Sequence, residues 1–343
     1  MGNKSENRGR RLVLSIFVST LGTVFVLLLA AGIYGKWLLS RVCQVPKQTQ
    51  PLSSEQINDI LSQDPVGTKP TDMDVLEIEE VLWAPAEKLD PESHIFNILL
   101  LGQDRRPGEV RARTDTMILV TVNTDANTLT LTSFMRDTYV RIPGYCDNRL
   151  NVPYVLGGVE LLYDTLEVNF GIRPDRYVEV DFDGFEQLID RIGGIDLYVS
   201  GGEAQFMNAI GGWDLGEGTH HLSGAKALAY ARNRTTGGMG DFERTERQRK
   251  VIGALLERAS GLNLLTLNGL LTGASELIRT DMTSGEVLKY LVRFYPMLSN
   301  LDSVENVRIP YGDYYYASWA DGIGAVIVPD LEKNSAIIAK YQK

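Results

Sequence analysis

The chain has few of the side chains from which metal centres and nucleophilic dyads are most often built. It contains only three histidines and two cysteines among its 343 residues. His94, His220 and His221 do not form a ligand set, and neither Cys43 nor Cys146 has the partners of a metal site. A metal centre of this kind and a histidine-based hydrolase are therefore disfavoured. The positions of the two cysteines favour free thiols over a single disulfide.

Lysine is absent between Lys88 and Lys226, although the same stretch contains ten arginines. The sequence also lacks the glycine-rich phosphate loop of nucleotide-binding proteins and the dinucleotide-binding fingerprint. Arginine presents a rigid fork of donors that binds phosphate oxygens two at a time, and it does not deprotonate. Lysine would serve if bulk positive charge were needed. Arginine without lysine, mixed with aspartate, therefore indicates phosphate groups and a divalent metal.

The chain is acidic, with a net charge of −10. Its first 36 residues contribute +4, so the remainder carries −14. Binding of nucleic acid requires a basic surface that neutralises many phosphates, so nucleic acid is not an expected partner. A small anionic group held in a locally basic pocket fits such an acidic body better.

Residues 12–34 carry no charge. As a helix they would span roughly 35 Å, which is enough to cross a bilayer core of about 30 Å. Four cations precede them, so we predict a cytoplasmic tail over residues 1–11, a membrane anchor over 12–34 and an extracytoplasmic remainder. A cleaved signal peptide is the alternative, but its apolar region usually covers only about 7–15 residues. Residues 35–93 are broken by prolines and end in an acidic run, which predicts a solvated stalk.

The globular part begins near His94 and alternates strands with helices. Strand patterns cover 95–101, 117–122, 129–134, 177–182, 195–199, 304–309 and 325–328. Helical patterns cover 155–170, 185–192, 222–231, 242–259 and 286–294, followed by a closing helix. The alternation predicts a layered α/β domain, and the early hairpin predicts a mixed sheet.

Two aspartates are expected at one rim of this sheet. Asp104 follows the first strand, and Asp115 opens the next. Ligands of open α/β sheets bind at the carboxyl ends of strands. Magnesium takes one or two carboxylates and completes its shell with water and phosphate oxygens, so the pair is a candidate metal site. The alternative is that each aspartate caps a turn or pairs with an arginine.

Arginines flank both the aspartates and the next strand. Arg113 stands beside Asp115, and Arg136 stands beside Asp137 where that strand ends. Exposed ion pairs contribute only about 0–1 kcal/mol, which is weak reason to gather so many arginines. Phosphate clamping is therefore favoured over ordinary ion pairing.

A second group of arginines lies on two predicted helices. Arg232 and Arg234 end one helix, and Asp241 precedes the next as its expected N-cap. Three polar residues follow at i, i+3 and i+4, on one face of the second helix: Arg244, Arg247 and Gln248. Val251 continues this face at i+7, so the face could hold a charged head group together with its apolar tail. The alternative is a solvated face with an ordinary buried valine.

Aromatic residues gather near the C-terminus, at Tyr311, Tyr314, Tyr315, Tyr316 and Trp319. Such rings could stack on sugars. Packing in the core or in a hairpin is the favoured interpretation of their pattern.

Several segments together resemble the LytR–CpsA–Psr (LCP) family. In chain order they are NILLLGQD (97–104), RTDTM (113–117), SFMRDTYVRIPG (133–144), DGF (183–185) with DRIGGI (190–195), LSG (222–224) with ALAYARNR (227–234), and GDFERTERQ (240–248). They follow the family's order within residues 94–260, behind an N-terminal apolar segment. Each motif alone is weak, but the set is highly specific.

The resemblance implies transfer of a glycopolymer from a polyprenyl-pyrophosphate carrier to a hydroxyl of peptidoglycan. The product is a phosphodiester, and polyprenyl phosphate leaves. Teichoic acid, capsule and other wall glycans remain open as the polymer. The implied fold is a three-layer α/β/α sandwich with a mixed central sheet and an apolar tunnel for the lipid. On this basis residues 94–260 form the catalytic domain, and residues 261–343 pack on it.

The resemblance also assigns residues. The family's ligands for Mg²⁺ (or Mn²⁺) fall on Asp104 and Asp115. The implied catalytic residues are Arg113, Arg136, Asp137, Arg232 and Arg234. The implied pyrophosphate-binding residues are Arg113, Arg136, Arg149, Arg232, Arg234, Arg244, Arg247 and Gln248.

Two departures from the family pattern stand out. Met135 replaces the usual proline before Arg136, and Arg149 stands where many members have lysine.

The acceptor hydroxyl also needs a base, for which Asp104, Asp115 and Asp137 are all candidates. Two other functions use the same residues: hydrolysis of the lipid pyrophosphate with water as acceptor, and lipid-phosphate binding without catalysis.

Overall fold

The computed structural model describes residues 86–105, 111–238, 240–274, 276–298 and 304–343, together with Glu55, Ile57 and residues 69–70 and 73–75. The predicted cytoplasmic tail and membrane anchor lie outside the described residues, as does most of the predicted stalk. Within the described part of the chain, no helix is long and apolar enough to cross a membrane.

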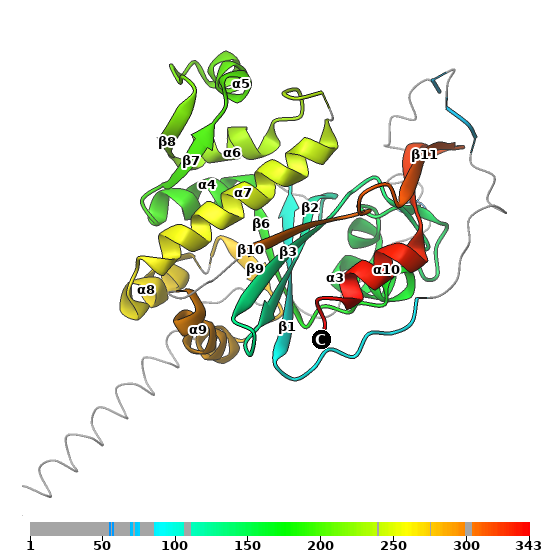
Figure 1. Cartoon of the computed structure of the whole chain (residues 1–343), viewed down its shortest axis with the longest axis horizontal. Helices are drawn as coiled ribbons and strands as arrows, with labels where there is room; N and C mark the ends of the chain where they lie inside the picture. Colours follow the sequence, from blue (N-terminus) through cyan, green and yellow to red (C-terminus); the bar gives the residue numbers. More distant parts are fainter. Residues whose placement is uncertain are drawn as a thin grey trace, which may run out of the picture.

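A mixed sheet of six strands runs through the described residues in the order β10-β3-β2-β1-β6-β9 (Figure 1). The strands are β1 (Ile95–Gln103), β2 (Thr114–Asn123), β3 (Thr128–Phe134), β6 (Arg176–Asp181), β9 (Ile278–Thr280) and β10 (Val304–Ile309). β1 and β6 are parallel, as are β3 and β10, and the other neighbouring pairs are antiparallel. The prediction of a mixed α/β sheet is confirmed.

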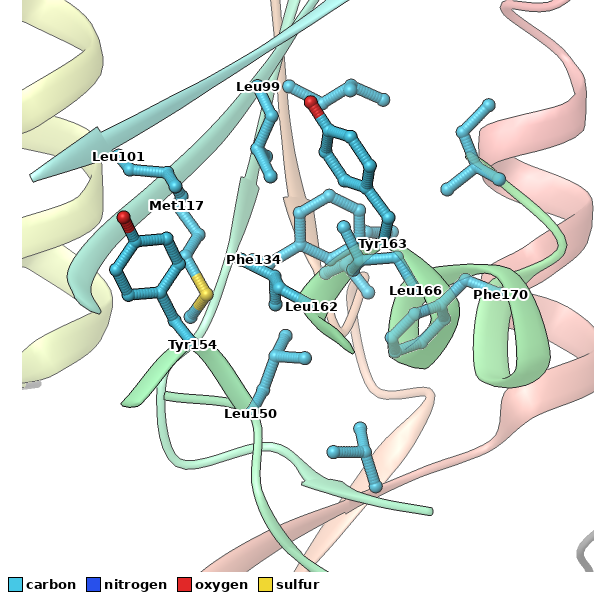
Figure 2. Close-up of a cluster of buried hydrophobic side chains, with 14 of the residues drawn as sticks. Leu99, Leu101, Met117, Phe134, Leu150, Tyr154, Leu162, Tyr163, Leu166 and Phe170 are labelled. Atoms are coloured by element: carbon cyan, nitrogen blue, oxygen red, sulfur yellow. The ribbon is translucent and has the colours of Figure 1, made fainter. Parts of the chain in front are cut away.

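One face of the sheet packs against α3 (Pro153–Phe170) and α10 (Leu331–Ala339). Leu99 and Leu101 of β1 point toward Leu162 and Leu166 of α3 across this core (Figure 2). α3 bends at Gly158, whose φ of 72° lies in the left-handed region that glycine adopts without strain.

The opposite face packs against α7 (Asp241–Ser260) and α9 (Ser284–Leu298). Ile118 and Leu131 of the sheet contact this second core, which also includes Ile252 of α7 and Phe294 of α9. Because both faces of the sheet are covered, the sequence of β1 is a nearly continuous apolar run and does not alternate between apolar and polar residues. Helices on both faces give the three-layer arrangement.

A smaller lobe is built on the other side of α7 (Figure 1). It contains α4 (Phe182–Arg191), α5 (Gly201–Gly211), α6 (Gly224–Arg232) and the hairpin of β7 (Ile195–Val199) with β8 (Gly218–Leu222). Tyr230, Met207 and Val251 are fully buried in its core. α8 (Leu264–Ala274) then leads from α7 toward α9.

A second hairpin, β11 (Tyr315–Ala320) with β12 (Gly324–Pro329), packs beside the short pair β4 (Tyr139–Val140) and β5 (Asn148–Arg149). Thr138 and Ile327 form a bridge between the two pairs. The C-terminal part of the chain therefore supplies both this hairpin and the edge strands β9 and β10 of the central sheet.

Some local predictions were wrong. Leu222 was expected to begin a helix, but it ends β8, and α6 begins at Gly224. The pattern of β8 is too polar to indicate a strand, and pairing with β7 decides its structure. α5 was not predicted, although Ser200 and Glu203 form the capping box that signals a helix start.

Met135 contributes to the sheet in a way that proline could not. Its backbone N–H donates a hydrogen bond to the carbonyl oxygen of Ile309, at 2.9 Å, and its side chain is fully buried. Proline has no N–H to donate. The residue that departs from the family pattern thus joins the end of β3 to the end of β10.

Candidate functional site

The candidate site lies at the edge of the sheet where β1 ends and β2 begins. Gly102 pairs with Thr116, and Gln103 pairs with Thr114, so Asp115 occupies a bulge between these two pairs. Asp104 follows Gln103 directly and is exposed, whereas Asp115 is half-buried. The antiparallel pairing therefore brings the two predicted metal ligands to one edge of the sheet, as expected.

Arg136 reaches this edge from the end of β3. Its Nη1 donates a hydrogen bond to Oδ1 of Asp115 at 2.7 Å, and its Nε lies 3.5 Å from Oδ2 of Asp137. Arg234, which follows α6, places its Nη2 3.6 Å from Oδ2 of Asp115. Residues that are far apart in the sequence thus share one ion-pair cluster.

Asp241 links the remaining arginines and was missed as a site residue. Its Oδ1 lies 2.8 Å from Nη2 of Arg244, 3.6 Å from Nε of Arg136 and 3.9 Å from Nε of Arg234. It was expected to be the N-cap of the helix, but Gly240 is the N-cap and Asp241 is the first residue of α7. The available signal was its i,i+3 spacing from Arg244.

Burial alone would raise the pKa of the Asp115 carboxyl, but the positive charges of Arg136, Arg244 and Arg234 outweigh it and hold the pKa below its ordinary value. Arg244 is almost fully buried, and this burial lowers the pKa of its guanidinium to about 10. Its Nη2 also donates to the backbone oxygen of Asp115 at 3.1 Å. Asp115 is therefore ionised at neutral pH and faces cations.

Asp137 differs from Asp115. Burial raises the pKa of its carboxyl, attraction to Arg136 opposes that rise, and repulsion from Asp241 adds to it, so the pKa lies above its ordinary value. Arg149 lies beside it, with Nε 3.7 Å from Oδ1 of Asp137. A carboxylate with a raised pKa is better suited to accept a proton than one held low.

Two guanidinium nitrogens in the cluster form no hydrogen bond to any described residue. These are the buried Nε of Arg136, which lies 3.5 Å from Oδ2 of Asp137 and 3.6 Å from Oδ1 of Asp241, and the buried Nε of Arg244. Buried donors without an acceptor are uncommon in native proteins and usually mark a place for a ligand, ion or water. Both donors belong to the same ion-pair cluster, which already contains Asp241.

Three other predicted phosphate-binding residues lie on segments that also carry members of the cluster. Arg113 is half-buried immediately before β2. Arg232 is exposed, and its guanidinium lies 4.4 Å from the ring centroid of Phe182. Gln248 lies half-buried on α7, one turn beyond Arg244.

Arg247 is held inside the smaller lobe. Its Nε donates to Glu203 at 2.7 Å, its Nη1 to the backbone oxygen of Asn233 at 3.0 Å, and its Nη2 to that of Thr236 at 2.7 Å. The side chain thus fixes the segment that carries Arg234 against α5 and α7. Among the described residues, Arg247 is hydrogen-bonded or ion-paired to Glu203, Asn233, Thr236 and Glu243 and not to the cluster, although it was expected among the pyrophosphate-binding residues.

The carboxylates at this edge of the sheet offer few ligands for a metal ion. Among the described residues, no group of three or more His, Cys, Asp or Glu side chains is arranged to hold a metal ion. Magnesium often binds through only one or two protein carboxylates, with water and phosphate oxygens as its other ligands. Asp104 with the ionised Asp115 fits that pattern.

The LytR_cpsA_psr family matches the chain over residues 71–339. The chain belongs to this family. The resemblance seen in the motifs is confirmed, and the matched range extends beyond the motif-bearing residues 94–260. In the structure, the C-terminal part of that range supplies strands β9 and β10 of the central sheet.

Relatives with described activities or ligands belong to the same family. The polyisoprenyl-teichoic acid–peptidoglycan teichoic acid transferase TagU of Bacillus anthracis is 31% identical over 316 residues, which cover 91% of this chain and 92% of TagU. The crystal structure of B. subtilis TagT has a TM-score of 0.59 at 27% identity, and covers 78% of this chain and 97% of TagT. A structure of the LytR-CPS2A-psr family protein YwtF (TagT) with bound octaprenyl pyrophosphate lipid has a TM-score of 0.57 at 26% identity, with the same coverage.

We predict that Asp241→Ala destabilises this LytR_cpsA_psr protein strongly. Arg244 is 3% exposed, so loss of its partner leaves a buried charge uncompensated, which costs about 3–5 kcal/mol. Glu246→Ala on the same helix is the matched control, because its pair with Lys250 is exposed and contributes only about 0–1 kcal/mol. Denaturant unfolding measures both, and equal small losses would contradict the prediction.

Proposed function

We propose that this protein is a phosphotransferase that moves a glycopolymer from a polyprenyl-pyrophosphate carrier to a hydroxyl of peptidoglycan. The observation that carries the proposal is the pair of buried, unsatisfied guanidinium nitrogens of Arg136 and Arg244 beside Asp115 and Asp241. Pyrophosphate oxygens would supply the acceptors that these donors lack. The name of TagU and the octaprenyl pyrophosphate bound to its relative TagT support the same substrate class.

The reaction requires little covalent help from the protein. The acceptor oxygen attacks the phosphorus that carries the sugar, and a new phosphodiester bond forms. The phosphoanhydride bond breaks, and its electrons leave with polyprenyl phosphate. Positioning and neutralisation of the phosphate charge lower the barrier in reactions of this type. Arg136, Arg234 and Arg244 would bind the oxygens on which that charge develops.

Asp137 is the base that we propose for the acceptor hydroxyl. Its carboxyl has a raised pKa, whereas the carboxyl of Asp115 is held low by the arginines around it. A base works best when its pKa approaches the working pH, so Asp137 is favoured over Asp115. The proton of the attacking hydroxyl would pass to Asp137 as the oxygen bonds to phosphorus.

A divalent cation, Mg²⁺ or Mn²⁺, belongs to the proposal. Asp104 and Asp115 would hold it at the edge of the sheet, together with oxygens of the substrate. When bound, such an ion neutralises charge on phosphate oxygens. The arginines of the cluster bind and orient the same pyrophosphate whether or not the ion shares its oxygens.

Attachment to the membrane is also part of the proposal. The uncharged residues 12–34, preceded by four cations, support a single-pass anchor with a cytoplasmic N-terminus and an extracytoplasmic catalytic part. Such an anchor would keep the site close to the leaflet that contains the lipid donor and raise the donor's local concentration.

The test of the proposed function is a transfer assay with the full chain in detergent. Lipid-linked saccharide, Mg²⁺ and peptidoglycan fragments are incubated together, and the products are separated by mass. We expect a phosphodiester conjugate, and we expect a chelator to abolish it. Release of phosphorylated sugar without conjugate would instead identify a hydrolase, and tight lipid binding without turnover would identify a binding module.

We predict that Arg136→Ala lowers the rate of transfer by roughly 10²–10³-fold, which corresponds to about 3–4 kcal/mol, because it removes a donor to the reacting phosphate. Arg173→Ala is the matched control, since that arginine pairs with Glu160, Asp164 and Glu167 on α3, away from the cluster. Single-turnover rates measure both variants. Transfer by the Arg136 variant at a rate close to that of the control would contradict the role.

We predict that the rate of transfer falls at acidic pH because the carboxylate of Asp137 becomes protonated. The base must be ionised, so activity is present above its folded pKa and is lost as the pH falls through it. Because this pKa is raised from 3.8, the loss should begin at a higher pH than for an ordinary aspartate. Profiles of kcat/KM for the parent and Asp137→Asn check this, and an unchanged profile in the variant would exclude Asp137 as the base.

A further inference from the structure

Two arginines lie together between α7 and the β10 edge of the central sheet, and we refer to Arg249 and Arg308 as the second arginine pair. Arg249 belongs to α7, which packs against β3 and β10, and Arg308 belongs to β10 (Figure 1). Arg308 is in register with Ser133 of β3, and Nη1 of Arg249 donates to the hydroxyl of that serine at 2.7 Å. Both arginine side chains therefore lie on the α7 face of the sheet.

The second arginine pair has no acidic counterpart. In the part of the chain that the structure describes, neither Arg249 nor Arg308 is ion-paired to a carboxylate. Glu246, one turn before Arg249 on α7, pairs instead with Lys250 at 2.8 Å. Positive charges at low exposure are costly without an opposite charge, and here two of them are neighbours. An anion would compensate both.

Arg249 is the more deeply buried of the two. It is 9% exposed, and its Nε is buried and forms no hydrogen bond to any described residue. Burial lowers the pKa of its guanidinium to about 10, attraction to Glu246 opposes the change, and repulsion from Arg308 adds to it. Arg249 is therefore still charged at neutral pH. A buried, charged donor without a hydrogen bond marks a place for a ligand, ion or water.

Arg308 is positioned by contacts that leave its charge uncompensated. Its guanidinium lies 4.3 Å from the ring centroid of Phe242, and its Nε donates to the backbone oxygen of Pro310 at 3.3 Å. Neither contact supplies a full negative charge. The guanidinium is thus held in place with its attraction for an anion largely intact.

The second arginine pair lies beside the catalytic cluster but is separate from it. Phe242, whose ring contacts Arg308, directly follows Asp241 of the cluster in α7. Arg249 follows Arg244 of the cluster in the same helix, at a rise of roughly 7–8 Å. A molecule whose pyrophosphate binds the cluster could therefore place a further phosphate group at the second arginine pair.

We propose that Arg249 and Arg308 form a second anion subsite, which binds a phosphate group that is not part of the reacting pyrophosphate. Arginine presents several donors to phosphate oxygens at once, and the negative charge of the phosphate would compensate two neighbouring guanidinium groups. Two sources have this chemistry: a phosphate within the transferred polymer, and a separate phosphate ion or ester. The inference rests on the proposed function only for the first source.

The first test measures unfolding of the full chain in detergent with inorganic phosphate, against chloride at the same ionic strength. A ligand that binds the folded state raises the midpoint of unfolding, whereas either salt screens the repulsion between the arginines. Arg308→Met alters an edge strand, so it remains usable if Arg249→Met does not fold. Arg258→Met is the matched control, because Arg258 is exposed near the end of α7.

We expect phosphate to stabilise the parent and the Arg258 control equally and both subsite variants less, since only the cluster remains in them to bind the ion. Equal stabilisation of the parent and the subsite variants by phosphate would overturn the subsite. Stabilisation of the parent by chloride to the same extent as by phosphate would also overturn it. The measurement needs no turnover, so its result stands even if the transfer assay refutes the proposed function.

The second test identifies the source with two lipid-linked donors that differ by one phosphate group on the saccharide. If the polymer supplies the phosphate, Arg308→Met should raise the KM of the phosphorylated donor by about tenfold, because a charge-assisted hydrogen bond is lost. The KM of the other donor and both kcat values should change by less than about twofold. Unchanged constants for both donors, with the stabilisation by phosphate lost, would assign the subsite to a separate phosphate. An equal rise in KM for both donors would show that these arginines bind the pyrophosphate itself and would overturn the proposal.

Discussion

Mutual neutralisation of arginines and aspartates is the constraint on which this site depends. Arg244 is nearly excluded from water, and Arg136, Asp115 and Asp241 are only partly exposed. Burying any one of these charges without its oppositely charged partners would cost free energy of folding. The charged side chains of the cluster therefore stabilise one another. The ion pairs leave selected guanidinium nitrogens without a hydrogen bond to the described residues. The ion pairs that compensate the buried charges therefore also leave guanidinium N–H groups that can donate to an anion.

The fold positions this cluster by bringing the ends of three strands and the start of one helix together. β1, β2 and β3 deliver Asp104, Asp115 and Arg136 to one edge, and α7 begins there with Asp241. Arg249 of α7 also donates to the hydroxyl of Ser133 in β3, at 2.7 Å, which joins the helix to the sheet. Because the supporting elements have cores on both faces, small displacements at the edge are resisted by packing throughout the domain.

The sequence predicted most of the sheet because its apolar runs are long and both faces are covered. It also predicted that Asp104, Asp115 and Arg136 share an edge, since strand ends meet there. It did not predict β8 or the role of Asp241. β8 is decided by pairing with β7, and the Asp241 carboxylate turns toward arginines that arrive from other elements. The exposure of Tyr311, Tyr314 and Tyr316 likewise depends on which residues fill the interior of the β11–β12 hairpin. No local sequence pattern indicates which residues these are.

The pairing of β3 with β10 has a consequence for the biogenesis of the protein. The end of β3 that leads into Arg136 is hydrogen-bonded to a strand more than 170 positions later in the chain, through Met135 and Ile309. Contacts of such wide separation form late, because loop closure must come first. The central sheet cannot be completed before residues 304–309 of β10 have been synthesised, so a polypeptide that stops short of them would lack the strand that pairs with the end of β3.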